Sequence, residues 1–179
     1  MPRALCRFIV LVLVSLTLSG CGYSLAGRGS FLPEHITTIG VPQFANHTPV
    51  FDIEQRFTDR VRSELIGRGR YKVVPERTGV DAVLIGELQS ITLSVAAFNE
   101  QQVATRYALT VVVKVEFRDL KTDKVLWSNP AWPFTDQFDV TNATSGTDAN
   151  AFLGNDITAQ ERLASEFARA LVSAILEAF

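Results

Sequence analysis

The chain has 179 residues, with 17 lysine and arginine residues against 19 aspartate and glutamate residues. This length predicts one domain once any targeting segment is removed. The slight acidic excess excludes the strongly basic surface expected of a general nucleic-acid-binding protein, so we expect no nucleic acid among the partners.

The first twenty residues have the pattern of a secretory signal peptide. Arg3 and Arg7 form a short positive segment, and an apolar run of 11 residues follows at 8–18. This run is shorter than the about 20 residues that a membrane-spanning helix needs, and it fits the central part of an export signal. We therefore expect residues 1–20 to be cleaved from the mature protein.

A lipidation motif follows the apolar run. Leu18, Ser19, Gly20 and Cys21 resemble the bacterial lipobox, in which two small residues precede a cysteine. The resemblance implies cleavage before Cys21 and attachment of lipid to its sulfur. Because Cys6 leaves with the signal peptide, no intrachain disulfide and no free catalytic thiol remain.

Residues 21–34 are rich in glycine and serine and are expected to form a lipidated tether. From Cys21 to Ile36 the chain spans at most about 50 Å when fully extended. The remaining domain, residues 35–179, should therefore work close to the membrane that holds the lipid.

The first half of this domain alternates short strands with one helix. Residues 36–41 and 71–74 are predicted strands, and 42–50 is a loop. Asp52 and Gln55 resemble a capping box that opens a helix, and Gly67 and Gly69 end it. The buried stripe of this helix is expected at Ile53, Phe57, Val61 and Leu65.

Three long strands follow. Residues 82–97 change the parity of their apolar positions, which predicts a β-bulge near Gln89 and Ser90. A polar hairpin tip is expected at 98–104, and residues 105–118 alternate cleanly between apolar and polar side chains. After a turn at 119–124, residues 125–138 are predicted to form another strand. Pro130 and Pro133 lie within it and indicate an edge strand or a bulged strand.

The last segment predicts a polar loop at 139–156 and a terminal helix. Thr158 and Glu161 resemble a second capping box. The expected buried stripe is Leu163, Phe167, Leu171 and Ile175. The order is β-α-β-β-β-β-α. It predicts an α+β two-layer sandwich, with two helices on one face of a mostly antiparallel sheet of four to five strands.

Residues able to carry chemistry are few. His35 and His47 fall in predicted loops and are expected to be solvated, and no cysteine remains to complete a zinc site with them. No nucleophile elbow and no phosphate-binding glycine loop is present in the sequence. We therefore expect a protein that is not an enzyme and has no metal and no cofactor.

Two basic groups remain as candidate binding residues. One comprises Arg68, Arg70, Lys72 and Arg77, and the other comprises Arg106, Lys114 and Arg118 on the polar side of one strand, with Lys121 and Lys124 beyond it. The second group could bind phosphates or carboxylates of an anionic partner. Ordinary surface charge is the open alternative, because polar side chains are expected on the solvated face of a strand.

The order of motifs along the mature chain resembles the LptE family of lipopolysaccharide-assembly lipoproteins. The beginning of the mature chain gives the strongest part of this resemblance: Cys21-Gly22-Tyr23-Ser24-Leu25, then Leu32-Pro33, then the strand 36–41. The helix after Asn46, the alternating central strands, the segment 125–127 and the long terminal helix also match.

The resemblance implies a function and a location. Members of this family are the plug subunit of the outer-membrane lipopolysaccharide translocon: they occupy the lumen of a large β-barrel, assist its assembly and contact lipopolysaccharide in transit. The expected location is the outer membrane, with the domain facing the periplasm or inside the barrel. Arg106, Lys114 and Arg118 are the expected lipopolysaccharide contacts because they share one face, and no alignment to the family supports them.

A second resemblance stays open. Residues 41–74 share a strand, Phe-Asn loop, helix and strand with lipoproteins of the curli-secretion or peptidoglycan-synthase-activator type. The short tether favours the translocon subunit, because synthase activators usually carry longer linkers that cross the periplasm.

Overall fold

The computed structural model describes residues 32–68, 70–139 and 157–178. They belong to the second of the two compact units of the chain, residues 31–179. The expected signal peptide, the lipobox Leu18-Ser19-Gly20, the lipidated Cys21 and the loop 140–156 lie outside the described residues. The elements in chain order are β1 (Thr38–Gly40), β2 (Ala45–Asn46), α2 (Ile53–Gly67), β3 (Lys72–Val74), β4 (Ala82–Phe98), β5 (Ala104–Asp119), β6 (Lys124–Asp139) and α4 (Ile157–Glu177).

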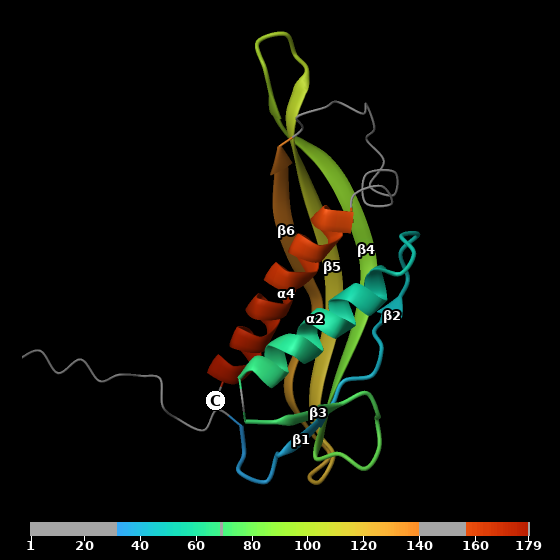
Figure 1. Cartoon of the computed structure of the whole chain (residues 1–179), viewed down its shortest axis with the longest axis vertical. Helices are drawn as coiled ribbons and strands as arrows, with labels where there is room; N and C mark the ends of the chain where they lie inside the picture. Colours follow the sequence, from blue (N-terminus) through green and yellow to red (C-terminus); the bar gives the residue numbers. More distant parts are fainter. Residues whose placement is uncertain (1–31, 69, 140–156, 179) are drawn as a thin grey trace, which may run out of the picture. The chain divides into compact units, whose positions relative to one another are not determined.

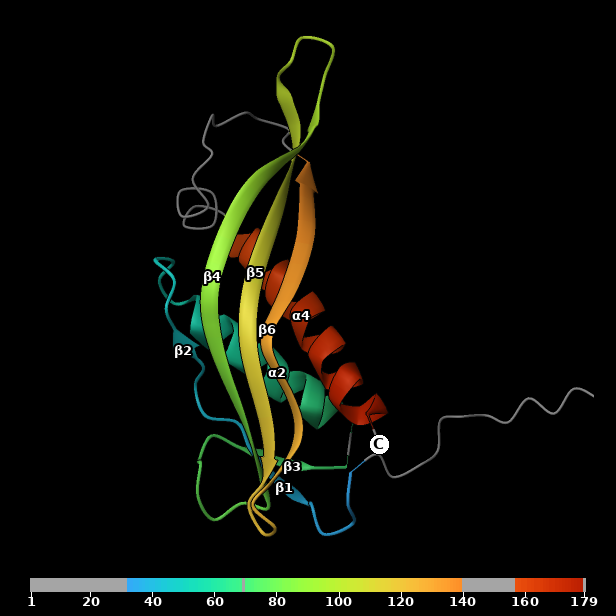
Figure 2. The same cartoon turned by 180° about the vertical axis from the view of Figure 1, so that it is seen from behind.

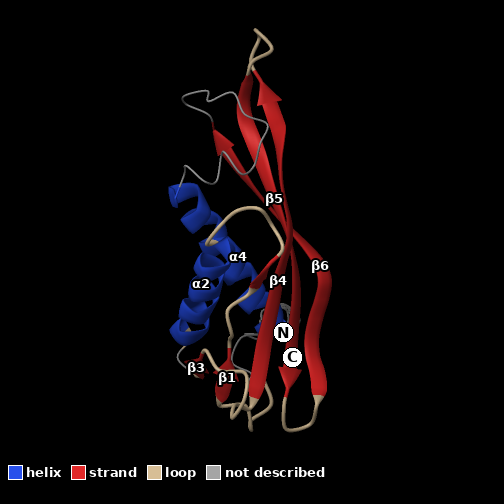
Figure 3. Cartoon of the chain, turned by 90° about the vertical axis from the view of Figure 1, so that its right-hand side faces the viewer, coloured by secondary structure: helices blue, strands red, loops and turns tan. Residues whose placement is uncertain are grey.

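The described elements form two layers, one of sheet and one of helix. Figure 1 shows α2 and α4 lying side by side across one face of the sheet, and Figure 2 shows the opposite face free of helices. Seen from the side in Figure 3, the helices lie together on one side of the long strands. The predicted α+β sandwich with both helices on one face is therefore confirmed.

The sheet has six strands, with β2 paired to β4 beside the order β3-β1-β4-β5-β6. This is slightly more than the four to five expected, because the two-residue β2 lies in a segment predicted as loop. The long pairs β4–β5 and β5–β6 are antiparallel, while the short β1, β2 and β3 pair in parallel. Helix α2 connects the parallel neighbours β1 and β3, as parallel strands require a crossover.

The irregularities of the sheet follow the sequence closely. The register of β4 against β5 shifts between Leu88 and Ser90, so the bulge predicted from the parity change is confirmed. Strand β6 is both the last strand in the sheet order and bulged, since its register shifts near Pro130. Proline lacks an N–H group and is tolerated at such positions.

The core lies between the two layers. Both helical stripes expected from the sequence are buried, as are the apolar positions of β5. The ring centroids of Phe57 on α2 and Phe167 on α4 are 5.1 Å apart, which joins the two helices. Trp132 and Phe134 of β6 pack at 5.9 and 6.0 Å from Phe167 and close the side of the core.

Both predicted capping boxes are wrong. Asp52 precedes α2 with a left-handed backbone (φ 61°) and makes no side-chain cap hydrogen bond. Helix α4 includes Ile157, so Thr158 lies inside the helix and does not cap it. The carboxylate of Glu161 instead accepts hydrogen bonds from Arg56 and Arg60 of α2. In each case a tertiary contact or a special backbone conformation replaces the local motif.

Candidate functional site

The three basic residues singled out in the sequence lie on the solvated face of β5. Arg106, Lys114 and Arg118 alternate with buried residues that face the helices, so they point away from the core. At about 3.4 Å per residue, Arg106 and Lys114 are separated by about 27 Å and Lys114 and Arg118 by about 14 Å. They therefore share a face but do not form one compact binding site.

Each of these cations is paired with a carboxylate. Arg106 Nε lies 2.7 Å from Asp139 Oδ1, and Lys114 Nζ lies 3.0 Å from Glu87 Oε1. Arg118 lies 2.9 Å from both Glu116 and Asp123. These pairs lie at the solvated surface, where ion pairs are weak and exchangeable. An anionic ligand can therefore compete for the cations.

The other basic group lies between the end of α2 and the turn after β3. Arg68 bonds to Glu64 at 3.1 Å and to Ser173 at 3.2 Å, while Arg70, Lys72 and Arg77 are exposed. Lys121, which follows Arg118 in the first basic group, is bound to Asp81 at 2.7 Å.

The β4–β5 hairpin exposes apolar side chains at its tip. Phe98 is 59% exposed and Val103 is 49% exposed. The turn itself is ordered, because Asn99 Oδ1 accepts hydrogen bonds from the N–H groups of Gln101 and Val103. The last β5–β6 pair is Arg106 with Asp139, so the tip projects beyond β6 (Figures 1 and 2). The sequence predicted only a polar tip here, although Phe98 and Val103 flank its polar residues 99–102.

At the opposite end of β5, the buried carboxylate of Asp119 connects the segment before β1 with the β5–β6 turn through hydrogen bonds. Asp119 is 1% exposed and its Oδ2 lies 2.8 Å from His35 Nε2. Thr122 Oγ1 and the backbone N–H of Lys121 also donate to it at 2.8 Å. Burial raises the pKa of Asp119, but these hydrogen bonds outweigh it and lower the pKa to about 2. His35 is thus a structural partner whose side chain is still 36% exposed, so the expectation that it is solvated holds only in part; the exposed His47 agrees with that expectation.

Asp81 fixes the start of β1 in a similar way. Its carboxylate binds Lys121 and accepts hydrogen bonds from the backbone N–H groups of Thr37 and Thr38 at 3.0 and 2.9 Å. The hydrogen bond from Lys121 is the main cause that holds the pKa of Asp81 well below its ordinary value. Together with Asp119 it anchors the beginning of the domain to the β5–β6 turn.

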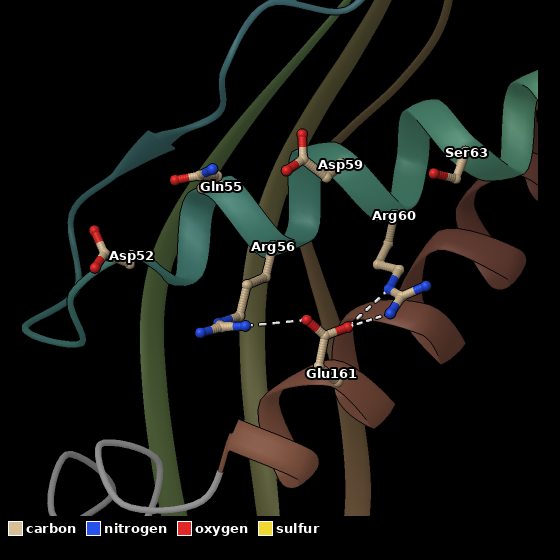
Figure 4. Close-up of a pocket in the computed structure, with 7 residues that line it drawn as sticks. All are labelled: Asp52, Gln55, Arg56, Asp59, Arg60, Ser63 and Glu161. Carbon is tan, nitrogen blue, oxygen red and sulfur yellow. Dashed lines mark hydrogen bonds and ion pairs between the residues drawn. The ribbon is translucent and has the colours of Figure 1, made fainter.

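A polar pocket of about 400 Å³ lies where α2 and α4 begin. Figure 4 shows Arg56 and Arg60 of α2 converging on Glu161 of α4. Arg56 Nη1 donates to Glu161 Oε1 at 3.0 Å, and Arg60 Nε donates to Oε2 at 2.8 Å. The hydrogen bond from Arg60 is the main cause that lowers the pKa of Glu161. The sequence alone did not indicate this cluster, because 101 to 105 residues separate the arginines from Glu161.

Two further observations concern possible metal sites and membrane-spanning helices among the described residues. Within the described ranges, no three histidine, cysteine, aspartate or glutamate residues gather as a possible metal site. None of the helices described there combines the length and the apolar character needed to span a bilayer.

Several solved structures are similar to the chain at low sequence identity. Protein CT253 from Chlamydia trachomatis is 9% identical, with 79% of this chain and 98% of that chain covered and a TM-score of 0.50. Lipoprotein GNA1162 from Neisseria meningitidis is 16% identical, with 79% and 99% covered and a TM-score of 0.44. Protein XCC0632 from Xanthomonas campestris is 14% identical, with 80% and 85% covered and a TM-score of 0.49. No curated protein matches the chain.

A family model identifies the chain. The model described as "LptE: Lipopolysaccharide-assembly" matches residues 36–175, which is well over half of the sequence. The match extends far beyond residues 41–74, the segment on which the resemblance to curli-secretion and synthase-activator lipoproteins depends. It starts after the Cys21–Pro33 opening and does not include that motif. The chain therefore belongs to the LptE family of lipopolysaccharide-assembly lipoproteins.

Proposed function

We propose that this lipoprotein plugs a large outer-membrane β-barrel, assists the assembly of that barrel and contacts lipopolysaccharide on its way to the cell surface. Membership of the lipopolysaccharide-assembly family over residues 36–175 is the observation that carries the proposal. In this role the domain acts by binding, without enzymatic activity and without a cofactor.

The anchor fits such a role. One acyl chain binds a membrane only marginally, whereas two or more chains hold a protein there stably. A fully acylated Cys21 would therefore keep the domain in the outer membrane. The short tether to Ile36 reaches at most about 50 Å, which supports a partner in or at the same membrane.

The surface of the sheet supports contact with lipopolysaccharide, which carries both phosphate groups and acyl chains. Arg106 is the expected contact closest to the exposed Phe98 and Val103, so cationic and apolar groups lie together at the projecting end of the hairpin. Lys114 and Arg118 would extend this contact along the solvated face. Arginine is well suited to phosphate because it donates two parallel hydrogen bonds.

A pull-down tests the partner. The full-length chain, recovered from outer membranes in a mild detergent, should bring a large β-barrel protein with it in stable complex. Recovery of a peptidoglycan synthase without such a barrel would contradict the proposal and favour the activator class of lipoproteins.

Charge reversal tests the lipopolysaccharide contacts. The triple variant Arg106→Glu, Lys114→Glu, Arg118→Glu should bind purified lipopolysaccharide more weakly, with a smaller dependence on salt than the parent chain. Arg169→Glu is the matched control, because Arg169 is an exposed arginine on α4 with one ion pair to Glu166 at 3.1 Å. Equal binding by the triple variant and the control would leave these residues as ordinary surface charge.

A further inference from the structure

Among the described strands, the order β3-β1-β4-β5-β6 ends on two strands of very different length. Strand β3 has three residues, whereas β6 runs over Lys124–Asp139. Figure 2 shows β6 at the border of the three long strands, with β5 on its inner side. A long open edge presents backbone N–H and C=O groups that a further strand can bind, so natural proteins protect such edges.

The middle of β6 offers few backbone donors to a further strand. Pro130 and Pro133 have no backbone N–H group. The N–H of Ala131, which lies between them, donates to Asn129 Oδ1 at 3.1 Å. The last part of the strand, residues 134–139, contains no proline. This part therefore needs another kind of protection.

In this last part, two side chains bind the backbone of Gln137. Its N–H donates to Asp136 Oδ1 at 2.8 Å, and its C=O accepts a hydrogen bond from Arg162 Nη2 of α4 at 2.7 Å. The N–H and C=O groups of one residue in an antiparallel strand point to the same side. Because both groups of Gln137 bond side chains, they lie on the open side of β6 and do not point toward β5. An added strand would need these same two groups.

Asp136 and Arg162 also bind each other, and we call the pair the edge clip. Arg162 Nε lies 2.9 Å from Asp136 Oδ2. The guanidinium carbon of Arg162 lies 4.2 Å from the ring centroid of Phe138. One guanidinium group thus contacts a carboxylate, a backbone carbonyl and an aromatic ring of β6. A planar group with several donors is suited to hold all three.

We propose that the edge clip is an autoinhibitory contact, which closes the end of β6 against strand addition by a second copy of this chain. With the clip in place, Arg162 occupies the carbonyl of Gln137 and Asp136 occupies its N–H. Loss of the clip exposes both groups at once. This goes beyond the proposed function, because it concerns association of the chain with itself.

The sequence of residues 134–139 suits pairing with a second copy of itself. In an antiparallel pair centred on Gln137, Thr135 stands opposite Asp139 of the second copy, and Asp136 stands opposite Phe138. Like charges directly opposite each other destabilise a strand pair, and none face each other in this register. Thr135 and Asp139 share the open side with Gln137, because the backbone of a strand repeats every two residues. The occupant that fits this edge is therefore the same segment of another copy.

Sedimentation equilibrium of the full-length lipidated protein, in a density-matched non-ionic detergent, tests the clip. The parent should keep the mass of one chain at concentrations at which Arg162→Ala forms dimers. Two backbone hydrogen bonds at Gln137 become available, so the dimer dissociation constant should fall by about tenfold or more. Arg169→Ala is the matched control, because Arg169 is also an α4 arginine with one ion pair, to Glu166 at 3.1 Å. It should sediment as the parent does.

Two further variants locate the association at β6. Gln137→Lys, placed in the Arg162→Ala chain, should restore the mass of one chain, because the two lysines would face each other at the centre of the pair. The side chain of Gln137 is exposed, so this change leaves the core intact. Asp136→Ala should form dimers as Arg162→Ala does, because it frees the N–H of Gln137 and removes the carboxylate that holds Arg162.

Three results would overturn the proposal. Equal masses of the parent and Arg162→Ala at every concentration would reduce the clip to an ordinary surface ion pair. Association of Arg162→Ala that Gln137→Lys does not reverse would mean that another surface is used. If circular dichroism shows that Arg162→Ala does not fold, Asp136→Ala decides: dimers support the clip, and the mass of one chain overturns it.

Discussion

Replacing Asp119 by asparagine should remove a pH-dependent part of the stability of the domain. The carboxylate is buried at the end of β5, and it accepts hydrogen bonds from His35, Thr122 and Lys121 at 2.8 Å each. These contacts lower its pKa from the ordinary 3.8 to about 2. Asparagine is neutral, and its amide nitrogen is a donor facing other donors.

The size and sign of the effect follow from the pKa. A carboxylate whose pKa is lowered on folding stabilises the folded state above its ordinary pKa, and this contribution is lost as the pH falls towards the folded value. One pKa unit corresponds to about 1.4 kcal/mol, so the charged form of Asp119 contributes about 2 kcal/mol at pH 7. About 1 kcal/mol of this should already be lost at pH 3.

Urea unfolding at pH 7, 5, 4 and 3 measures the effect, with the full-length lipidated protein in a non-ionic detergent. The fluorescence of Trp127 and Trp132 reports unfolding, because the two rings are 5.6 Å apart and Trp132 packs on Phe167. Asp119→Asn should be less stable than the parent by about 2 kcal/mol at pH 7, and the gap should narrow by about 1 kcal/mol at pH 3.

Asp59→Asn is the control for this measurement. Asp59 is 56% exposed on α2 and pairs only with Arg62 among the described residues, so its replacement should cost little at any of these pH values. The reasoning fails if the gap between the parent and Asp119→Asn is the same at pH 7 and pH 3, since the buried charge would then contribute nothing through its pKa.

Two further predictions concern backbone packing and the anchor. Gly86→Ala should destabilise the domain by about 1–3 kcal/mol in the same urea assay, because a Cβ at Gly86 would meet the buried ring of Phe44 at 2.4 Å. Gly67→Ala is the control and should not destabilise the domain, because no atom lies within 4 Å of a Cβ built at Gly67. Equal losses of stability in the two variants would contradict the packing argument. Cys21→Ala should leave the circular dichroism spectrum of the domain unchanged and release the protein from membranes on fractionation; a variant that stays membrane-bound would show that partner contacts carry the anchoring.

Much of the fold could be predicted from the sequence because it rests on local periodicity. The apolar repeat at fours along α2 and α4 requires one buried face on each helix, whatever that face contacts. The strict alternation in β5 and the parity change near Gln89 likewise predict the buried face and the bulge. The prolines of β6 argue against a central strand, because proline has no backbone N–H to donate to a neighbouring strand.

The candidate sites were only partly predictable. Arg106, Lys114 and Arg118 share a face because the side-chain period of a strand is two, which is a local property. Glu116 and Asp123, the partners of Arg118, are close to it along the chain, but the partners of Arg106 and Lys114 are not local: Asp139 comes from β6 and Glu87 from β4. The same periodicity could therefore indicate a basic strip but could not show that each cation is already paired.

By itself, the sequence determined the two helical stripes, the long strands with their bulge, and the expected lipidation of Cys21, since each depends on residues close together along the chain. Only the tertiary structure decided the pairing of His35 with Asp119 and of Arg56 and Arg60 with Glu161, across 84 to 105 positions. It also decided that Asp52 and Thr158 do not cap their helices. Hydrogen bonds between distant segments depend on how the helices cross the sheet, and a pattern within one element does not contain that information.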